Sequence, residues 1–594
     1  MCGIAGVIGP LERAPENLDE ARRMIATLTH RGPDGVRVEQ VGGAALAHAR
    51  LSVIDLECGW QPLHAAGSTI IGNGEIYNYV ELIEEFGLKQ KLSTGSDFEP
   101  LLHIYAQEGE HAFTRLRGMY AFCLIGADGQ TWLVRDPFGI KPLYTANDRP
   151  VIPFASEARS LARAAEPPDL RPGVSEELLA LGYCLRTGAY ERAERVHPGE
   201  VHHLIQGWDE DVPVEGPTDD EPIWDERFGW PALHKGRTPI GGEEKLLTAL
   251  DAVLEDSVRV HQRSDVPYGL FLSGGIDSSV IATLMARLNS RPVTAFTCGF
   301  DAPGAADERA AAERVARALD LDWRETTFGA EDFRRIAPQV AWALDDPTTD
   351  YACLPTYKLA EAAKDTLTVV LSGEGGDELF AGYGRYRRAL RPAVLGGRPA
   401  EPQVDATFLK DGGRAALARW REAATRNRPA GLRPLQQAQW ADIATWLPND
   451  LLLKLDRMLM AHGLEGRTPF LDREVAAFAW SLPDRLKVRG RHGKRILRKW
   501  LERHCPAADP WARKQGFTVP VADWIAPDAR ATGERVARCR GVAEVCDLDA
   551  VRSVFTSGSH RKSWWPLVFY AMWWSIHVGG ASPEEAGEAV LGPA

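Results

Sequence analysis

Long hydrophobic runs and patterned cysteines are both missing from this 594-residue sequence. No stretch is long and apolar enough to span a bilayer, and the start MCGIAGVIGP has neither the basic nor the apolar region of a signal peptide. The tryptophan-rich stretch from Lys562 to Val578 comes nearest and predicts a buried or interfacial helix. Nine cysteines show no CxxC or metal-like spacing, which argues against a disulfide framework and a zinc site. We expect a cytoplasmic protein in a reducing compartment.

An excess of basic charge is missing too, because the formal net charge is -13 at pH 7. This charge argues against a polyanion as the main partner, although it allows a local basic pocket for one nucleotide. The composition, 44% hydrophobic and 25% charged, is typical of a globular protein, and the length calls for at least two domains. We expect small-molecule substrates, no nucleic acid and no membrane, and leave a homodimer open.

The pattern of predicted elements changes along the chain. Residues 1–206 contain many short β-type runs broken by Gly, Asn and Asp turns, which predicts a layered β-rich domain. Residues 207–244 are acidic and rich in Pro and Gly, as in a linker. Residues 245–580 alternate helices with apolar strands, which predicts a doubly wound parallel sheet with a nucleotide site at the carboxyl ends of its strands. Within this domain residues 390–449 are predicted to be helical, and residues 581–594 form a polar tail.

Cys2 is the first candidate catalytic residue. Removal of Met1 would leave it with a free α-amine of pKa about 7.7–8.0, which can take the thiol proton. A buried small hydrophobe is the alternative for an isolated cysteine. The motifs that follow favour catalysis: His30-Arg31-Gly32-Pro33-Asp34-Gly35, Arg50-Leu51-Ser52, Asn73-Gly74-Glu75-Ile76-Tyr77-Asn78 and Thr94-Gly95-Ser96-Asp97. This ordered set resembles the class II glutamine amidotransferase domain.

The resemblance implies a four-layer α+β sandwich of the N-terminal nucleophile hydrolase type, in which Cys2 attacks the side-chain amide of glutamine. The Asn73 side chain and the Gly74 backbone N–H would stabilise the oxyanion. Arg50 would hold the α-carboxylate of glutamine, and Glu75 and Asp97 would receive its α-ammonium. The predicted glutamine-binding residues are thus Arg50, Asn73, Gly74, Glu75 and Asp97. Taken singly, these residues could form a turn, a surface cation or a helix cap. The segment from Arg135 to Tyr144 also matches the family and is expected to face the second domain.

A second motif follows the predicted strand from Val266 to Leu272. Ser273-Gly274-Gly275-Ile276-Asp277-Ser278-Ser279 joins that strand to a helix, so phosphate oxygens can approach its backbone N–H groups and the positive end of the helix dipole. An ordinary Gly-rich turn is the alternative, and no Walker lysine is present. The motif resembles the SGGxDS pyrophosphate loop of ATP pyrophosphatases, which transfer an adenylyl group to a carboxylate.

The segment from Leu371 to Tyr383 adds the family's second signature, SGEGGDE. The resemblance implies that Asp277 and Asp377 hold Mg²⁺ against the phosphates of ATP, whereas helix capping would be their ordinary role. Glu374 would take a proton from the attacking ammonia. Lys514 in RKQGF would neutralise the departing pyrophosphate, unless it is a simple surface lysine. The residues expected around ATP are Leu272, Ser273, Gly274, Gly275, Asp277, Ser278, Cys298, Ser372 and Gly373.

Together the two halves resemble the glutamine-hydrolysing asparagine synthetase family, whose central helix and turn match residues 453–472, including Glu465 and Arg467. The implied reaction converts aspartate, glutamine, ATP and water into asparagine, glutamate, AMP and pyrophosphate through β-aspartyl-AMP and internal ammonia transfer. Asp346 and Gly466 depart from the family pattern, so an acceptor in a peptide, an osmolyte precursor or a sugar acid stays open. A non-catalytic binding or regulatory protein is a third possibility, which the intact set of Cys2, Asp277, Glu374, Asp377 and Lys514 disfavours.

Overall fold

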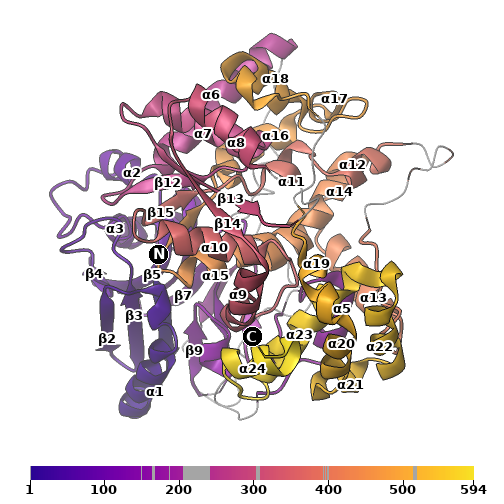
Figure 1. Ribbon diagram of the computed structural model, residues 1–594. Coiled ribbons are helices and arrows are strands. Elements are labelled where there is room, and N and C mark those ends of the chain that lie inside the picture. Colours follow the sequence, from indigo (N-terminus) through magenta and orange to yellow (C-terminus); the bar gives the residue numbers. More distant parts are fainter. Residues whose placement is uncertain are drawn as a thin grey trace.

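The computed structural model describes residues 2–146, 148, 150–162, 168–185, 187–204, 241–302, 308–391, 394, 397, 401–512 and 518–593 (Figure 1). Most of the predicted linker, and Lys514 with the rest of its motif, lie outside the described residues. In Figure 1 the strands of the amino-terminal half lie at the lower left, and the helices of the carboxyl-terminal half occupy the rest of the view.

The amino-terminal half contains two antiparallel sheets with a helix outside each. One has the order β10-β8-β9-β1-β3-β2: β1 Gly3–Ile8, β2 Gly35–Val41, β3 Ala44–Arg50, β8 Tyr144–Thr145, β9 Ile152–Ala155 and β10 Glu194–Arg195. The other has the order β11-β7-β6-β5-β4: β4 Leu63–Ala65, β5 Ser68–Ile76, β6 Gly118–Ile125, β7 Thr131–Arg135 and β11 Val201–Leu204. The outer helices are α1 Ala14–Ala26 and α3 Glu99–Glu108, and the smaller ones are α2 Tyr79–Glu85, α4 Arg159–Ala162 and α5 Val174–Leu181.

Alternation along β1 explains this layering. Ile4 and Ile8 join the apolar cluster between the sheets, whereas Ala5 and Val7 pack with residues of α1. Successive side chains of a strand point to opposite faces, so a strand that is apolar at every position is buried on both sides. The predicted four-layer α+β sandwich is confirmed.

The carboxyl-terminal half is built on a five-stranded sheet in which every strand pair is parallel, in the order β14-β13-β12-β15-β16. Its strands are β12 Tyr268–Phe271, β13 Thr294–Phe300, β14 Asp322–Phe328, β15 Val369–Leu371 and β16 Glu465–Arg467. Helices that flank or extend the sheet are α6 Glu243–His261, α7 Ile276–Leu288, α8 Arg309–Ala318, α9 Ala330–Ala343, α10 Cys353–Ala363, α11 Gly376–Phe380, α12 Gly384–Ala389, α15 Leu452–Met460, α16 Arg473–Ser481, α17 Asp484–Lys487 and α18 Arg495–His504. The predicted doubly wound sheet with additional helices is confirmed.

Strand β16 lies inside the segment expected to be a helix and a turn. Gly466 explains how it fits, because a Cβ there would lie 3.0 Å from Leu455 Cγ and 3.2 Å from Leu459 Cδ2. A larger residue would require the Leu455 and Leu459 side chains of α15 to shift by a few tenths of an ångström. The departure at Gly466 therefore concerns the packing of α15 against β16.

The predicted helical stretch 390–449 contains α13 Arg414–Thr425 and α14 Pro434–Ala441, which continues into a π-helix, η6 Asp442–Leu451. The tryptophan-rich stretch is α23 Trp564–His577, which is buried as expected. The predicted polar tail contains a capped helix, α24 Pro583–Leu591, whose Ala586 and Val590 pack in the main core. Helices α19 Val521–Ile525, α20 Ala529–Ala537, α21 Arg540–Val545 and α22 Leu548–Thr556 complete this part. Among the described residues, no helix has the length and apolarity needed to cross a membrane.

Candidate active site

Cys2 immediately precedes β1 and lies beside β5 of the second antiparallel sheet. Its backbone N donates to Asn73 Oδ1 at 3.1 Å, and its Sγ lies 3.7 Å from the Leu51 carbonyl oxygen. Asn73 is completely buried on β5, and its Nδ2 has no hydrogen-bond partner in the described part of the chain. Gly74 has φ 136°, and a Cβ there would lie 2.0 Å from the Met119 carbonyl oxygen. A buried amide donor beside a thiol, followed by a residue that must be glycine, is the geometry an oxyanion hole requires.

The Cys2 thiol needs a base before it can react. Burial raises the pKa of Cys2 above its ordinary value. A protonated thiol is a poor nucleophile, so a proton acceptor must be close by. The nitrogen that becomes an α-amine when Met1 is removed is the one that already donates to Asn73, and it belongs to Cys2 itself.

The other predicted glutamine-binding residues line the same small pocket as Cys2. Arg50, on β3, donates to the Asp55 and Leu56 carbonyl oxygens and lies over the Trp60 ring at 4.9 Å. Asp97 accepts from the Ile76 N–H at 2.6 Å. Burial, together with nearby acids, raises the pKa of both Glu75 and Asp97. An ammonium group would relieve this concentration of negative charge.

His48 is a pocket residue that the sequence prediction missed. It lies on β3 two residues before Arg50, lines the Cys2 pocket and is buried, and neither ring nitrogen has a hydrogen-bond partner among the described residues. Burial, followed by the charge of Arg50, lowers the pKa of His48 to about 3. The imidazole is therefore neutral at physiological pH. Alternation along the strand could have identified it, since residues two apart on a strand share a face.

Buried ion pairs connect the Cys2 pocket to the second half of the molecule. Arg31 donates to Asp456 through two nitrogens, at 2.7 and 3.0 Å, and to Glu157 at 3.0 Å. Its Nε also donates to the Cys2 carbonyl oxygen at 3.3 Å. Asp456 lies on α15, so one guanidinium contacts both the backbone of the predicted nucleophile and the second domain. The segment from Arg135 to Tyr144 faces that domain as expected, and Lys141 Nζ donates to the Gly466 carbonyl oxygen at 3.4 Å.

Asp346, a departure from the family pattern, belongs to this interface. It accepts hydrogen bonds from Arg195 and, at 2.9 Å, from the Tyr144 hydroxyl. It is completely buried, so the change from glutamate concerns the contact between the domains. Glu465 and Arg467 also lie here as a buried pair at 2.5 Å, with Arg467 Nη2 3.5 Å from Glu75.

The second predicted site lies at the carboxyl ends of β12 and β15. The turn Ser273–Gly275 follows β12, and α7 begins at Ile276, as the sequence predicts. The Ser273 and Ser278 hydroxyls lie 3.0 Å apart. Gly274 has φ 72°, and a Cβ there would lie 2.6 Å from the Ala312 backbone nitrogen. This turn presents backbone N–H groups at the start of a helix of 13 residues, where phosphate binding is favoured.

The remaining residues predicted around ATP lie near this turn. A Cβ at Gly373 would lie 2.8 Å from Asp277 Cβ, so the two loops touch. The Ser372 N–H donates to the Arg467 carbonyl oxygen at 2.8 Å. Leu272, directly after β12, and Cys298, on the neighbouring strand β13, are both buried. The structure thus brings together the predicted ATP residues from both motifs.

Lys494, which the sequence prediction missed, bridges the two predicted metal ligands. Its Nζ is hydrogen-bonded to Asp277 and forms an ion pair with Asp377 at 2.7 Å. Lys494 has φ 53° and immediately precedes α18. Because one ammonium group contacts both acids, the carboxylates of Asp277 and Asp377 must point toward the same place. The two carboxylates fit Mg²⁺, which prefers oxygen ligands. The described residues contain no cluster of three or more metal-ligating side chains, so phosphate and water oxygens would have to complete the shell.

Glu374 lies next to this pair of carboxylates in a group of buried charges. Lys454, on α15, contacts Glu374 at 3.5 Å and Asp350 at 3.0 Å. Asp450 accepts from the Thr348 hydroxyl and lies in the same group. Burial raises the pKa of Glu374 above its ordinary value. A carboxylate with a raised pKa accepts a proton more readily, as the predicted role of Glu374 requires.

The comparisons with known proteins cover nearly the whole chain. The asparagine synthase family model matches residues 249–575, and the glutamine amidotransferase domain model matches residues 1–211. Glutamine-hydrolyzing asparagine synthetase 1 of Bacillus subtilis (strain 168) is 32% identical over 97% of each chain. Glutamine-hydrolyzing asparagine synthetase B of Escherichia coli (strain K12) is 29% identical over 88% of this chain and 83% of its own. Amidase chyE of Penicillium rubens is 26% identical over 89% of each chain.

Proposed function

Since the chain belongs to the asparagine synthase family and is a glutamine-hydrolysing ligase, we propose that it uses glutamine nitrogen and ATP to convert aspartate into asparagine. AMP, pyrophosphate and glutamate are the other products. The observation that carries the synthetase half of this proposal is the convergence of Asp277, Asp377 and Lys494 beside the turn Ser273–Gly275. Such a group of charges is suited to binding a nucleoside triphosphate with its metal ion.

In the amino-terminal half, the Cys2 thiol gives its proton to its own α-amine and attacks the side-chain amide carbon of glutamine. Asn73 Nδ2 and the Gly74 N–H donate to the oxygen that becomes negative. Arg50 binds the α-carboxylate, and Glu75 and Asp97 receive the α-ammonium. Ammonia leaves when the tetrahedral intermediate collapses, and water then releases glutamate from the thioester. The neutral ring of His48 is available to a water molecule or to the substrate.

In the carboxyl-terminal half, the acceptor carboxylate attacks the α-phosphorus of ATP and pyrophosphate leaves. Mg²⁺, held by Asp277 and Asp377, would neutralise phosphate charge when bound. Lys494 supplies a further positive charge next to both acids. Ammonia then attacks the acyl carbon, AMP leaves with the bridging oxygen, and Glu374 takes the proton that nitrogen loses. Lys454 keeps Glu374 in place. Lys514 stays a predicted contributor.

The test is pyrophosphate release from ATP and Mg²⁺, with glutamine or ammonium as the nitrogen source and aspartate as the acceptor. We expect release with both sources and an equal amount of asparagine. No release with any carboxylate would refute the synthetase assignment. If pyrophosphate is released with another carboxylate but not with aspartate, the result would instead favour the second candidate, a paralogous amide synthetase. The cleft described next is the observation in favour of that candidate.

A further inference from the structure

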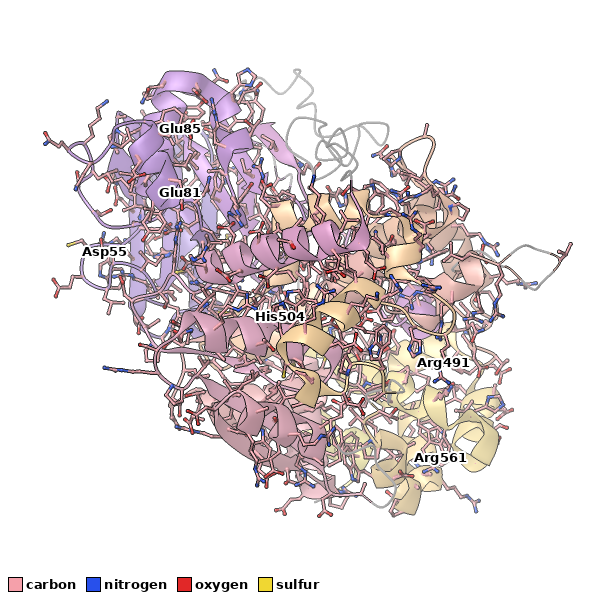
Figure 2. All side chains as sticks on the ribbon, turned by 90° about the horizontal axis from the view of Figure 1, so that it is seen from above. Asp55, Glu81, Glu85, Arg491, His504 and Arg561 are labelled. Atoms are coloured by element: carbon pink, nitrogen blue, oxygen red, sulfur yellow. The ribbon has the colours of Figure 1, made fainter. Side chains whose placement is uncertain are left out.

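A deep cleft with a cationic lining lies beside the synthetase site. It has a volume of about 980 Å³ and is bounded by α12, the π-helix η6 and the loop at Gly490 and Arg491. Its charged lining includes five arginines: Arg385, Arg387, Arg388, Arg391 and Arg491. In Figure 2, Arg491 lies on the opposite side of the view from Asp55 and Glu81, which mark the amino-terminal half. The cleft is therefore distinct from the Cys2 pocket.

The acids in this cleft are already neutralised. Asp442 is paired with Arg385 at 2.9 Å, and Glu401 is paired with Arg421 at 3.0 Å. Arg388 and Arg391 form no ion pair with the described residues. Trp446 adds a buried Nε1–H without a hydrogen-bond partner. The groups that the described residues leave without a partner, Arg388, Arg391 and the Trp446 Nε1–H, are thus donors, in a chain whose net charge is -13. A local field of the opposite sign favours a negatively charged occupant.

Two connections join the cleft to the reaction centre. Tyr383, in the cleft, donates to Glu378 at 2.6 Å, and Glu378 follows Asp377 directly. On η6, Trp446 lines the cleft, while Asp450 lies four residues further on, in the charge group around Glu374. The cleft wall and the reaction centre are therefore joined through two short stretches of the chain, residues 377–383 and 446–450.

We propose that the cleft binds the body of an acidic peptide, one carboxylate of which is activated and amidated at the Glu374 centre. This rests on the synthetase chemistry of the proposed function, and the peptide is an acceptor in addition to aspartate. The volume lies at the upper end of the ~300–1,000 Å³ usual for small-molecule sites, which is far more than one amino acid fills. In the reaction, pyrophosphate leaves as the peptide carboxylate forms its adenylate. The C–N bond then replaces the C–O bond to AMP, and the proton passes to Glu374.

The ring geometry favours a peptide over an acidic sugar. Arg385 lies over the Tyr383 ring at 4.2 Å and within 5.4 Å of the Trp446 ring, so a guanidinium already covers these faces. Trp420 is only 5% exposed. Among the described residues, the rings of this cleft are thus buried or covered on one face by a guanidinium, which leaves a sugar little face on which to stack. Guanidinium groups bind carboxylates through two parallel hydrogen bonds, which suits the side chains of aspartyl and glutamyl residues.

The experiment compares the intact wild-type enzyme with Arg388→Glu and, separately, Arg391→Glu. Both side chains are exposed, so the fold should tolerate the change. Arg23→Glu on α1 is the control, because it makes the same charge change on an exposed surface of the other half. Fluorescence anisotropy measures binding of labelled triglutamate. Pyrophosphate release with ATP, Mg²⁺ and ammonium measures turnover with triglutamate, digalacturonate and aspartate.

We expect triglutamate to bind and to support release, with Kd and KM raised about tenfold or more in both cleft variants and unchanged in Arg23→Glu. Kinetics with aspartate should change less than twofold. If triglutamate neither binds nor reacts while aspartate does, the peptide site is refuted and the proposed function stands. If binding is lost in the variants but no carboxylate releases pyrophosphate, the cleft is supported and the proposed function fails. A preference for digalacturonate, or a raised KM for ATP alone, would overturn the peptide assignment.

Discussion

Replacing Arg31 with methionine tests whether the two halves depend on their buried ion pairs. Arg31 and Asp456 are 0% and 2% exposed and are joined by two hydrogen bonds, and Glu157 is the second acid that Arg31 contacts. Asp456 keeps Arg457 at 3.0 Å, and Glu157 keeps Arg159 at 2.9 Å. The network nevertheless loses one positive charge and leaves one buried negative charge uncompensated.

The cost follows from the burial of this charge. Removing one partner of a buried ion pair lowers the free energy of unfolding by about 3–5 kcal/mol. At about 2–4 °C per kcal/mol for a domain of 150–250 residues, Tm should fall by roughly 6–20 °C. Arg31 also holds the Cys2 carbonyl oxygen, so glutamine-dependent synthesis should decrease more than ammonia-dependent synthesis at a temperature where the variant is folded.

Thermal denaturation and pyrophosphate release with each nitrogen source provide the two measurements. Arg22→Met is the matched control, because Arg22 makes an exposed pair with Asp19 on α1. The double variant Arg31→Met with Asp456→Leu should regain part of the lost stability, since it removes the unpaired charge. The reasoning fails if Tm in Arg31→Met stays within about 2 °C of wild type, or if both nitrogen sources lose activity equally.

Four further outcomes are expected. Cys2→Ala should abolish glutamine-dependent synthesis and leave ammonia-dependent synthesis intact, and loss of both would contradict the division of labour between the domains. Asp277→Asn should stop pyrophosphate release with either nitrogen source, and continued release would exclude its role at the phosphates. Lys494→Met should lower pyrophosphate release by about 10²-fold or more, while glutamine hydrolysis, measured as glutamate formed, persists. His48 has a folded pKa of about 3 against 6.5 for an unperturbed ring, so the unfolded chain binds more protons between these values. Stability should therefore fall by up to ~1.4 kcal/mol per unit as pH drops below 6.5, and urea unfolding of His48→Leu should show a flatter dependence.

The residues that the sequence identified best are those in contiguous motifs at the ends of strands. Asn73 and Gly74 belong to one strand, and Ser273 to Ser278 form the turn after β12 and the first turn of α7, so local sequence determines their arrangement. Lys494 could not be recognised in the same way, because it is one of several basic residues in RHGKRILRKW. Only its position beside Asp277 and Asp377 distinguishes it.

The arginines of the cleft also could not be identified as one group from the sequence. Four of its arginines follow one another closely in GYGRYRRALR, which the sequence makes visible, but Arg491 comes 100 residues after Arg391. No periodicity links such positions. The domain boundaries, the Mg²⁺ ligands and the role of Lys514 stay predictions, as does the identity of the acceptor.

The π-helix η6 couples the cleft to the reaction centre through its winding. Pro448 lies within it and lacks an amide hydrogen, so it cannot complete the regular bonding pattern of an α-helix. A π-helix holds more residues per turn than an α-helix, so loss of one residue between Asp442 and Trp446 would let this segment take α-helical winding. The cleft residues Asp442 and Trp446 would then change their position relative to one another, while the flanking helices kept theirs. A one-residue deletion in η6 is thus expected to alter the cleft wall without any substitution at the chemical centre.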